Sequence, residues 1–291
     1  MANPLIHPNW DRPPVRITEG YSLEMTAKDE PSLRDAAPLI APDTPIAITY
    51  LPGEAMAARV AATVAVRDLG FEPMPHFSAR RILSQDDFGG YLKAVVEQAG
   101  VRRCFIVAGD PPAPEGPYAD TMALLATGAF EQAGIQAIGI GGHPEGHPNM
   151  TPAECWDVLG RKVAEIERRG MAPLIVTQFG FDPDAFLGWL EQLRARGIAC
   201  PVRIGVPGPA GIKRLLAYAA RCGVGASTAV LKKYGISVAN LLGTAGPDRL
   251  VDAFERGLGP QHGRVRLHFY PFGGMAKTVQ WIAERDARTA G

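Results

Sequence analysis

The chain has 291 residues, of which 46% are apolar and 21% charged, and its 30 lysines and arginines equal its 30 aspartates and glutamates. This balance predicts a globular protein and argues against a nucleic-acid or anionic-membrane partner. No run approaches the ~18 apolar residues of a transmembrane helix. Residues 1–16 lack the apolar segment of a secretory signal, so we expect a cytoplasmic protein.

Eight short, mostly apolar runs recur along the chain after a polar, proline-rich stretch at residues 1–18. Their apolar middles are typical of parallel strands that are covered on both faces. The expected strands are Tyr21–Met25, Ile46–Tyr50, Glu72–Phe77, Arg103–Ala108, Ala137–Gly141, Pro173–Gln178, Val202–Val206 and Arg266–Tyr270.

Helical patterns occupy the intervening segments. Thr151 followed by Pro152 is a favourable helix start, and Gly197 is a favourable stop. The expected helices are Ala55–Leu69, Asp87–Ala99, Thr121–Ala133, Ala153–Arg169, Asp184–Arg196, three near Ala210–Arg221, Thr228–Leu242 and Pro247–Gly257, and a last one at Met275–Asp286.

Alternating strands and helices predict an α/β fold, namely a single-domain (β/α)8 TIM barrel over residues 19–291 with residues 1–18 as an N-terminal extension. The alternative is an open doubly wound sheet. That fold normally has a glycine-rich phosphate turn after an early strand. The segment after the first strand, residues 26–31, contains no glycine, and the chain has no G-x-G-x-x-G motif.

Polar side chains end most of the predicted strands, where a barrel of this kind builds its active site. Glu24 interrupts an apolar strand, and a carboxyl group withdrawn from water suits general-acid chemistry. The alternative for Glu24 is a pair with a lysine or arginine. Asp110, after Gly109 and before two prolines, is either functional or a turn residue.

The sixth strand ends in a polar and aromatic segment. The amide of Gln178 suits the edge of a heterocycle, and Phe179 and Phe181 are either walls of a flat pocket or core residues. After the fifth strand, His143 and His147 are four residues apart. Prolines and glycines exclude a helix there, so we expect no metal site.

Together these segments resemble the methylenetetrahydrofolate reductase family. The resemblance runs in family order from the first strand to the last. The segments that carry it are Ser22-Leu23-Glu24, Ile48-Thr49-Tyr50, Pro75-His76, Gly109-Asp110-Pro111-Pro112, His143-Pro144-Glu145-Gly146-His147-Pro148, Thr177-Gln178-Phe179-Gly180-Phe181-Asp182 and His268-Phe269-Tyr270.

The resemblance implies reduction of 5,10-methylenetetrahydrofolate to 5-methyltetrahydrofolate by NADH or NADPH through bound FAD. It implies that Glu24 is the general acid and that Asp110 contacts the pterin and tunes the flavin. The implied folate-binding residues are Gln178, Asp110, Phe179, Phe181 and Tyr270. The implied cofactor-binding residues are Thr49, His76, Gly109, Asp110, Tyr118, Ala119, His143, His147, Asp157 and Lys162.

The chain departs from the family pattern at Ala108, at His143 and at Gly273-Gly274, where the family usually has an arginine, a tyrosine and an Asn-Arg pair. Two alternatives therefore stay open: a flavin-independent reductase of the same folate, and a non-redox folate-binding or methyl-carrier partner protein. The sequence also leaves open the choice between NADH and NADPH and the formation of a homo-oligomer.

Overall fold

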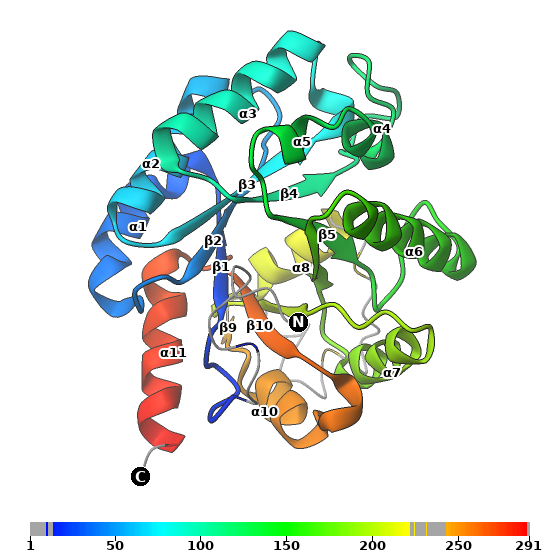
Figure 1. Ribbon diagram of the computed structural model, residues 1–291. Coiled ribbons are helices and arrows are strands. Elements are labelled where there is room, and N and C mark those ends of the chain that lie inside the picture. Colours follow the sequence, from blue (N-terminus) through cyan, green and yellow to red (C-terminus); the bar gives the residue numbers. More distant parts are fainter. Residues whose placement is uncertain (1–9, 11–13, 222–223, 225–230, 232–242, 290–291) are drawn as a thin grey trace.

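The computed structural model describes Trp10, residues 14–221, Val224, Leu231 and residues 243–289. Eight parallel strands close into a barrel in the order β1-β10-β7-β6-β5-β4-β3-β2, so the predicted fold class is confirmed (Figure 1). The strands are β1 (Ser22–Met25), β2 (Pro45–Ile48), β3 (Glu72–Ser78), β4 (Arg103–Val107), β5 (Ala137–Gly142), β6 (Ala172–Phe179), β7 (Val202–Pro207) and β10 (Val265–Tyr270).

Helices surround the barrel and cover its outer face (Figure 1). They are α1 (Glu30–Ala36), α2 (Met56–Asp68), α3 (Gln85–Ala99), α4 (Thr121–Ala126), α5 (Ala129–Gln132), α6 (Pro152–Arg168), α7 (Pro183–Ala195), α8 (Ile212–Arg221), α10 (Asp248–Gly257) and α11 (Met275–Thr289). Short 3-10 turns are η1 (Ala27–Asp29), η2 (Ala37–Leu39), η3 (Ala79–Arg81) and η4 (Pro260–His262).

Local sequence signals account for most of these boundaries. At the start of α6, Thr151 Oγ1 accepts a hydrogen bond from the Glu154 amide at 3.3 Å, and the Thr151 amide donates to the Glu154 carboxylate at 2.7 Å, which confirms the predicted cap. The helix predicted over residues 121–133 is instead split into α4 and α5, because Gly128 has a φ of +71°. Helix α1 was not predicted, and the helix predicted at Thr228–Leu242 lies outside the described residues apart from Leu231.

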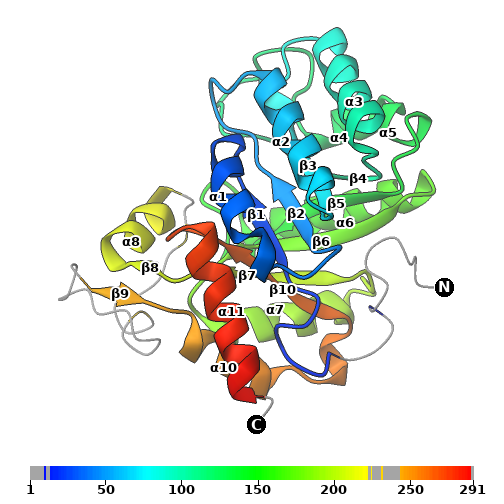
Figure 2. The same ribbon diagram turned by 90° about the vertical axis from the view of Figure 1, so that its left-hand side faces the viewer.

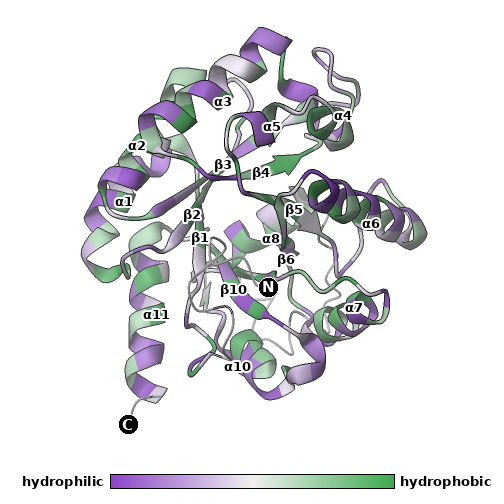
Figure 3. Cartoon of the chain, viewed as in Figure 1, coloured by the Kyte–Doolittle hydropathy of each residue, from purple (hydrophilic) through white to green (hydrophobic). Residues whose placement is uncertain are grey.

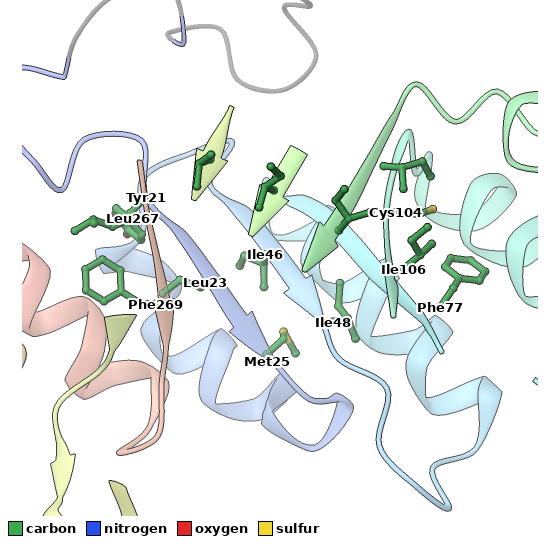
Figure 4. Close-up of a cluster of buried hydrophobic side chains, with 14 of the residues drawn as sticks. Tyr21, Leu23, Met25, Ile46, Ile48, Phe77, Cys104, Ile106, Leu267 and Phe269 are labelled. Atoms are coloured by element: carbon green, nitrogen blue, oxygen red, sulfur yellow. The ribbon is translucent and has the colours of Figure 1, made fainter. Parts of the chain in front are cut away.

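The main hydrophobic core lies between the strands and the helices. Outward-facing strand residues such as Leu23, Met25 and Phe269 pack there, as Figure 4 shows for the side of the barrel around β1. Because side chains alternate along a strand, the residues between them face the barrel interior. Glu24 lies between Leu23 and Met25 and is therefore directed inward.

The carboxyl ends of the strands form the mouth of the barrel. After β7, a two-stranded antiparallel pair, β8 (Ala210–Gly211) with β9 (Thr244–Ala245), and helix α8 lie beyond this end (Figure 2). Phe179 and Phe181 pack with residues of this unit, among them Ile212 and Leu215, in a second hydrophobic cluster.

The amino end of the barrel contains buried arginines. Arg203 and Arg266, each the second residue of its strand, are 0% and 2% exposed, and hydrophilic residues on β10 are visible in Figure 3. Trp10, from the predicted N-terminal extension, is 3% exposed, and its ring lies 5.3 and 5.2 Å from the two guanidinium carbons. Burial lowers the pKa of Arg203 to about 9, with Arg103 and Arg266 adding repulsion.

Candidate active site

Glu24 lies in the barrel interior between two histidines. Its Oε2 is 3.7 Å from His268 Nε2 on β10 and 3.9 Å from His76 Nε2 on β3, and its side chain is 21% exposed. These distances exceed that of a good hydrogen bond, so the groups are in contact without a direct bond. Among the described residues, no lysine or arginine forms an ion pair with Glu24. In the described part of the chain, the alternative that Glu24 pairs with a lysine or arginine is therefore wrong.

Both histidines beside Glu24 are buried and stay neutral at neutral pH. Burial lowers the pKa of His76 to about 4, against the opposing attraction of Glu24, and it also lowers the pKa of His268. His268 Nδ1 is 2.8 Å from the Ser22 hydroxyl, and His76 stacks on Phe105 at a ring distance of 4.6 Å. Glu24 thus occupies a mostly buried position among neutral groups whose orientations are fixed.

An irregularity in β6 shapes the opposite wall of the mouth. The register between β6 and β7 shifts between Val176 and Phe179. Thr177 holds this bulge, because its hydroxyl accepts from the Gly205 amide at 2.8 Å and its carbonyl accepts from the Tyr270 hydroxyl at 3.0 Å. Bulges re-aim side chains next to functional sites, and this one lies at Gln178.

The predicted folate-binding residues of this wall differ in exposure. Gln178 is half-buried, and its Oε1 accepts from the Phe179 amide at 3.1 Å. Phe179 and Phe181 are each 1% exposed, so both rings lie within packed structure. Tyr270 is half-buried, and its ring is 5.5 Å from that of Phe179. Gln178 and Tyr270 are therefore the more accessible members of this group.

Glu145 fixes the segment that follows Gln178, a role that its position in the sequence does not predict. Its Oε1 accepts hydrogen bonds from the amides of Phe181 and Asp182 at 2.7 and 2.8 Å. A Cβ at Gly180 would lie 2.5 Å from the same oxygen, which explains the glycine there. Burial raises the pKa of Glu145, opposed by these two bonds. The position of Glu145 inside the His-Pro-Glu-Gly-His-Pro segment was the one signal available.

Asp110 lies on the loop between β4 and α4, which we call the β4–α4 loop (residues 108–120). Its side chain is 82% exposed, and its carboxylate is 3.5 Å from the Arg81 guanidinium. Gly109 has a φ of +96°, and a Cβ there would lie 2.4 Å from the Ser78 hydroxyl. This glycine therefore lets the loop approach the end of β3 closely.

Three of the predicted cofactor residues, His143 and His147 before α6 and Lys162 on α6, influence one another electrostatically. The rings of His143 and His147 are 4.8 Å apart and perpendicular. Burial lowers the pKa of His143 to about 4, and the neighbouring charge of Lys162 acts in the same direction on both histidines. Burial also lowers the pKa of Lys162 itself, while Asp120 opposes this shift.

The other predicted cofactor residues lie in varied surroundings. Thr49 is half-buried at the end of β2, and Tyr118 is buried with its ring 5.5 Å from that of Phe88. Ala119 is exposed, and its carbonyl accepts from Arg80. Asp157 is exposed on α6 and pairs with Arg161 at 3.2 Å.

The part of the chain that the structure describes contains no cluster of three or more histidine, cysteine or acidic side chains able to hold a metal ion. None of its helices combines the length and apolar character needed to span a bilayer.

The chain is similar in sequence to known proteins. A family model described as methylenetetrahydrofolate reductase matches residues 26–240, more than half of the chain. The maize protein "Methylenetetrahydrofolate reductase (NADH) 1" is 29% identical over 125 residues, which are 39% of this chain and 21% of the maize protein. "Methylenetetrahydrofolate reductase 2" of Saccharomyces cerevisiae is 29% identical over 129 residues, 42% of this chain and 20% of the yeast protein. The match thus spans about a fifth of each relative.

Among solved structures, a dihydropteroate synthase from Thermus thermophilus superposes with a TM-score of 0.50 and 14% identity, over 94% of both chains. At that identity the likeness concerns the barrel fold, and one barrel fold supports many chemistries.

Proposed function

Because the chain belongs to the methylenetetrahydrofolate reductase family, we propose that it reduces 5,10-methylenetetrahydrofolate to 5-methyltetrahydrofolate with NADH or NADPH as the hydride donor. The observation that carries the proposal is the environment of Glu24. Its carboxyl group lies in the barrel interior between two neutral imidazoles, without a lysine or arginine partner among the described residues. A carboxyl in such surroundings is suited to deliver a proton.

In the proposed reaction, Glu24 donates a proton to the ring nitrogen that leaves as the five-membered ring of the folate opens. The bridging carbon then carries cationic character, which the Asp110 carboxylate stabilises electrostatically. Hydride transfer to that carbon forms the methyl group and leaves NAD⁺ or NADP⁺. Gln178 offers a donor and an acceptor to the edge of the pterin.

The donor set near α6 fits a phosphate-bearing cofactor such as FAD. Lys162 is half-buried beside two imidazoles with lowered pKa values, and no carboxylate of the described residues lies within 4.0 Å of its ammonium group. A phosphate would place a negative charge directly against this ammonium group. We propose that Lys162, His143 and His147 hold this part of the cofactor. When bound, FAD would pass the hydride from the nicotinamide to the folate.

The test is a Glu24→Gln variant assayed with methylenetetrahydrofolate and each nicotinamide. Loss of general-acid catalysis should lower turnover by roughly two to four orders of magnitude and leave flavin binding intact. Glu97→Gln, an exposed carboxyl on α3, is the control and should keep full activity. Turnover of Glu24→Gln near that of the control would remove Glu24 from the mechanism.

The absorbance spectrum of the purified protein distinguishes the two redox versions of this function. Flavin bands that disappear in a Lys162→Met variant would support FAD binding at α6. A colourless protein that turns over without added FAD would replace this version with direct hydride transfer. Folate binding without oxidation of either nicotinamide, with and without FAD, would contradict a reductase and favour a folate-binding partner protein.

A further inference from the structure

The β4–α4 loop, which presents Asp110, is built directly on the segment that follows β3. These strands are neighbours in the barrel (Figure 1). A Cβ at Gly116 would lie 2.2 Å from the Ile82 carbonyl oxygen, so the two backbones touch there, and Gly109 lies close to the Ser78 hydroxyl. The position of Asp110 therefore depends on residues 78–83.

Arg80 binds the backbone of this loop at several points. Its amide donates to the Ala108 carbonyl at 2.8 Å, and its carbonyl accepts from the Glu115 amide at 2.7 Å. Its guanidinium donates to the carbonyl oxygens of Ala119 and Pro111 at 2.9 and 3.2 Å. Backbone and side-chain bonds together fix the loop before and after Asp110.

Arg81 acts on side chains of the loop. Its side chain is only 16% exposed, and its own carbonyl accepts from the Tyr50 hydroxyl at 3.3 Å. One guanidinium nitrogen is 3.5 Å from the Asp110 carboxylate and the other is 3.5 Å from that of Glu115. A largely buried guanidinium between two carboxylates favours the side-chain rotamers that keep both carboxylates within ion-pair distance.

Without this partner, Asp110 would be free to turn. Its side chain is 82% exposed, so no packing selects one rotamer. An ordinary surface ion pair contributes little, but Arg81 is already ordered and largely desolvated, so the pair loses less entropy and is less screened.

We propose that Arg81 is a positioning residue of this active site: its guanidinium holds the Asp110 carboxylate at the barrel mouth, ready to stabilise the cationic folate carbon. This inference rests on the proposed function. It assigns a role to a residue outside the segments that carry the family resemblance.

The experiment is a double-mutant cycle in the full chain, with Arg81→Met, Asp110→Asn and the double variant. Arg81→Met should lower kcat/KM for methylenetetrahydrofolate roughly tenfold, mainly through kcat, because Asp110 acts on charge that develops after binding. In the Asp110→Asn background the same change should have little further effect, since the carboxylate that Arg81 positions is gone. Arg81→Lys should fall between wild type and Arg81→Met.

Arg256→Met, an exposed change on α10, is the matched control and should leave activity unchanged. Thermal unfolding of every variant separates misfolding from misplacement. An active wild type whose Arg81→Met effect is equally large with and without Asp110 would overturn the positioning role while leaving the reductase intact. A wild type without folate reduction under any cofactor condition would remove both the proposed function and this inference.

Discussion

Replacing Glu145 by alanine tests whether one buried carboxylate holds the wall of the mouth. In the native chain Glu145 Oε1 accepts from two successive amides, at Phe181 and Asp182, just before α7 begins at Pro183. The alanine variant removes both hydrogen bonds and leaves a cavity, so we expect the loop to lose its defined conformation. The β6 bulge and Gln178 lie immediately before this loop.

The size of the effect follows from those two bonds. A hydrogen bond to a charged group contributes about 1.5–3 kcal/mol. Water reaching the freed amides, and the relief of burying the carboxylate, offset part of the sum, so we expect a loss of about 2–4 kcal/mol in the free energy of unfolding. At about 2–4 °C per kcal/mol, this lowers Tm by roughly 4–16 °C. Glu145→Gln keeps an acceptor oxygen without the charge and should lose less.

The assay is urea unfolding alongside steady-state kinetics. Glu97→Ala is the control, because its 3.9 Å pair with Lys93 is exposed and should contribute below about 0.5 kcal/mol. In Glu145→Ala, KM for the folate should rise more than kcat falls, since the altered loop supports the binding wall and not Glu24. Equal stability of Glu145→Ala and Glu97→Ala would refute the reasoning.

Three further predictions concern the barrel itself. The pKa of His76 falls from 6.5 to about 4 on folding, so between these values the unfolded chain binds more protons than the folded chain. The free energy of unfolding should therefore drop by about 2 kcal/mol between pH 7 and pH 5, and His143 acts in the same direction. If urea unfolding of His76→Gln shows the same pH dependence as the wild type, His76 is not the cause. Trp10→Ala should lower the free energy of unfolding in urea by about 3–5 kcal/mol, because the ring fills the barrel interior beside two buried arginines. An unchanged free energy of unfolding would mean that Trp10 adds nothing to the core. Gly205→Ala places a Cβ 2.6 Å from the backbone of the β6 bulge and should lower the free energy of unfolding by about 1–3 kcal/mol. Gly211→Ala is the control, because a Cβ there meets open space. Similar Tm values for the two variants would contradict the bulge geometry.

Much of the barrel is determined by local sequence. Apolar runs bounded by turn residues identified all eight barrel strands, because strands buried on both faces must be apolar and short. The helix cap at Thr151 could also be predicted from the sequence, since its partner Glu154 is only three residues away. The inward direction of Glu24 follows from the alternation of side chains along a strand.

The site depends on contacts that local sequence does not encode. The β6 bulge requires Thr177 to meet Gly205 and Tyr270, and the Glu145 bonds span more than 30 residues. No periodicity relates such positions, so they become visible only when the barrel closes.

The charged surroundings of the site are also a product of tertiary structure. The sequence left the partner of Glu24 open, and folding brings it beside His76 and His268, which lie 52 and 244 residues further along the chain. It likewise brings Arg81 to Asp110 and Trp10 to Arg203. Sequence by itself determined the eight barrel strands and most of the helices, since those depend on short-range patterning. Tertiary structure alone decided which charges are buried and which groups face them, because desolvation and Coulomb attraction depend on distance in space.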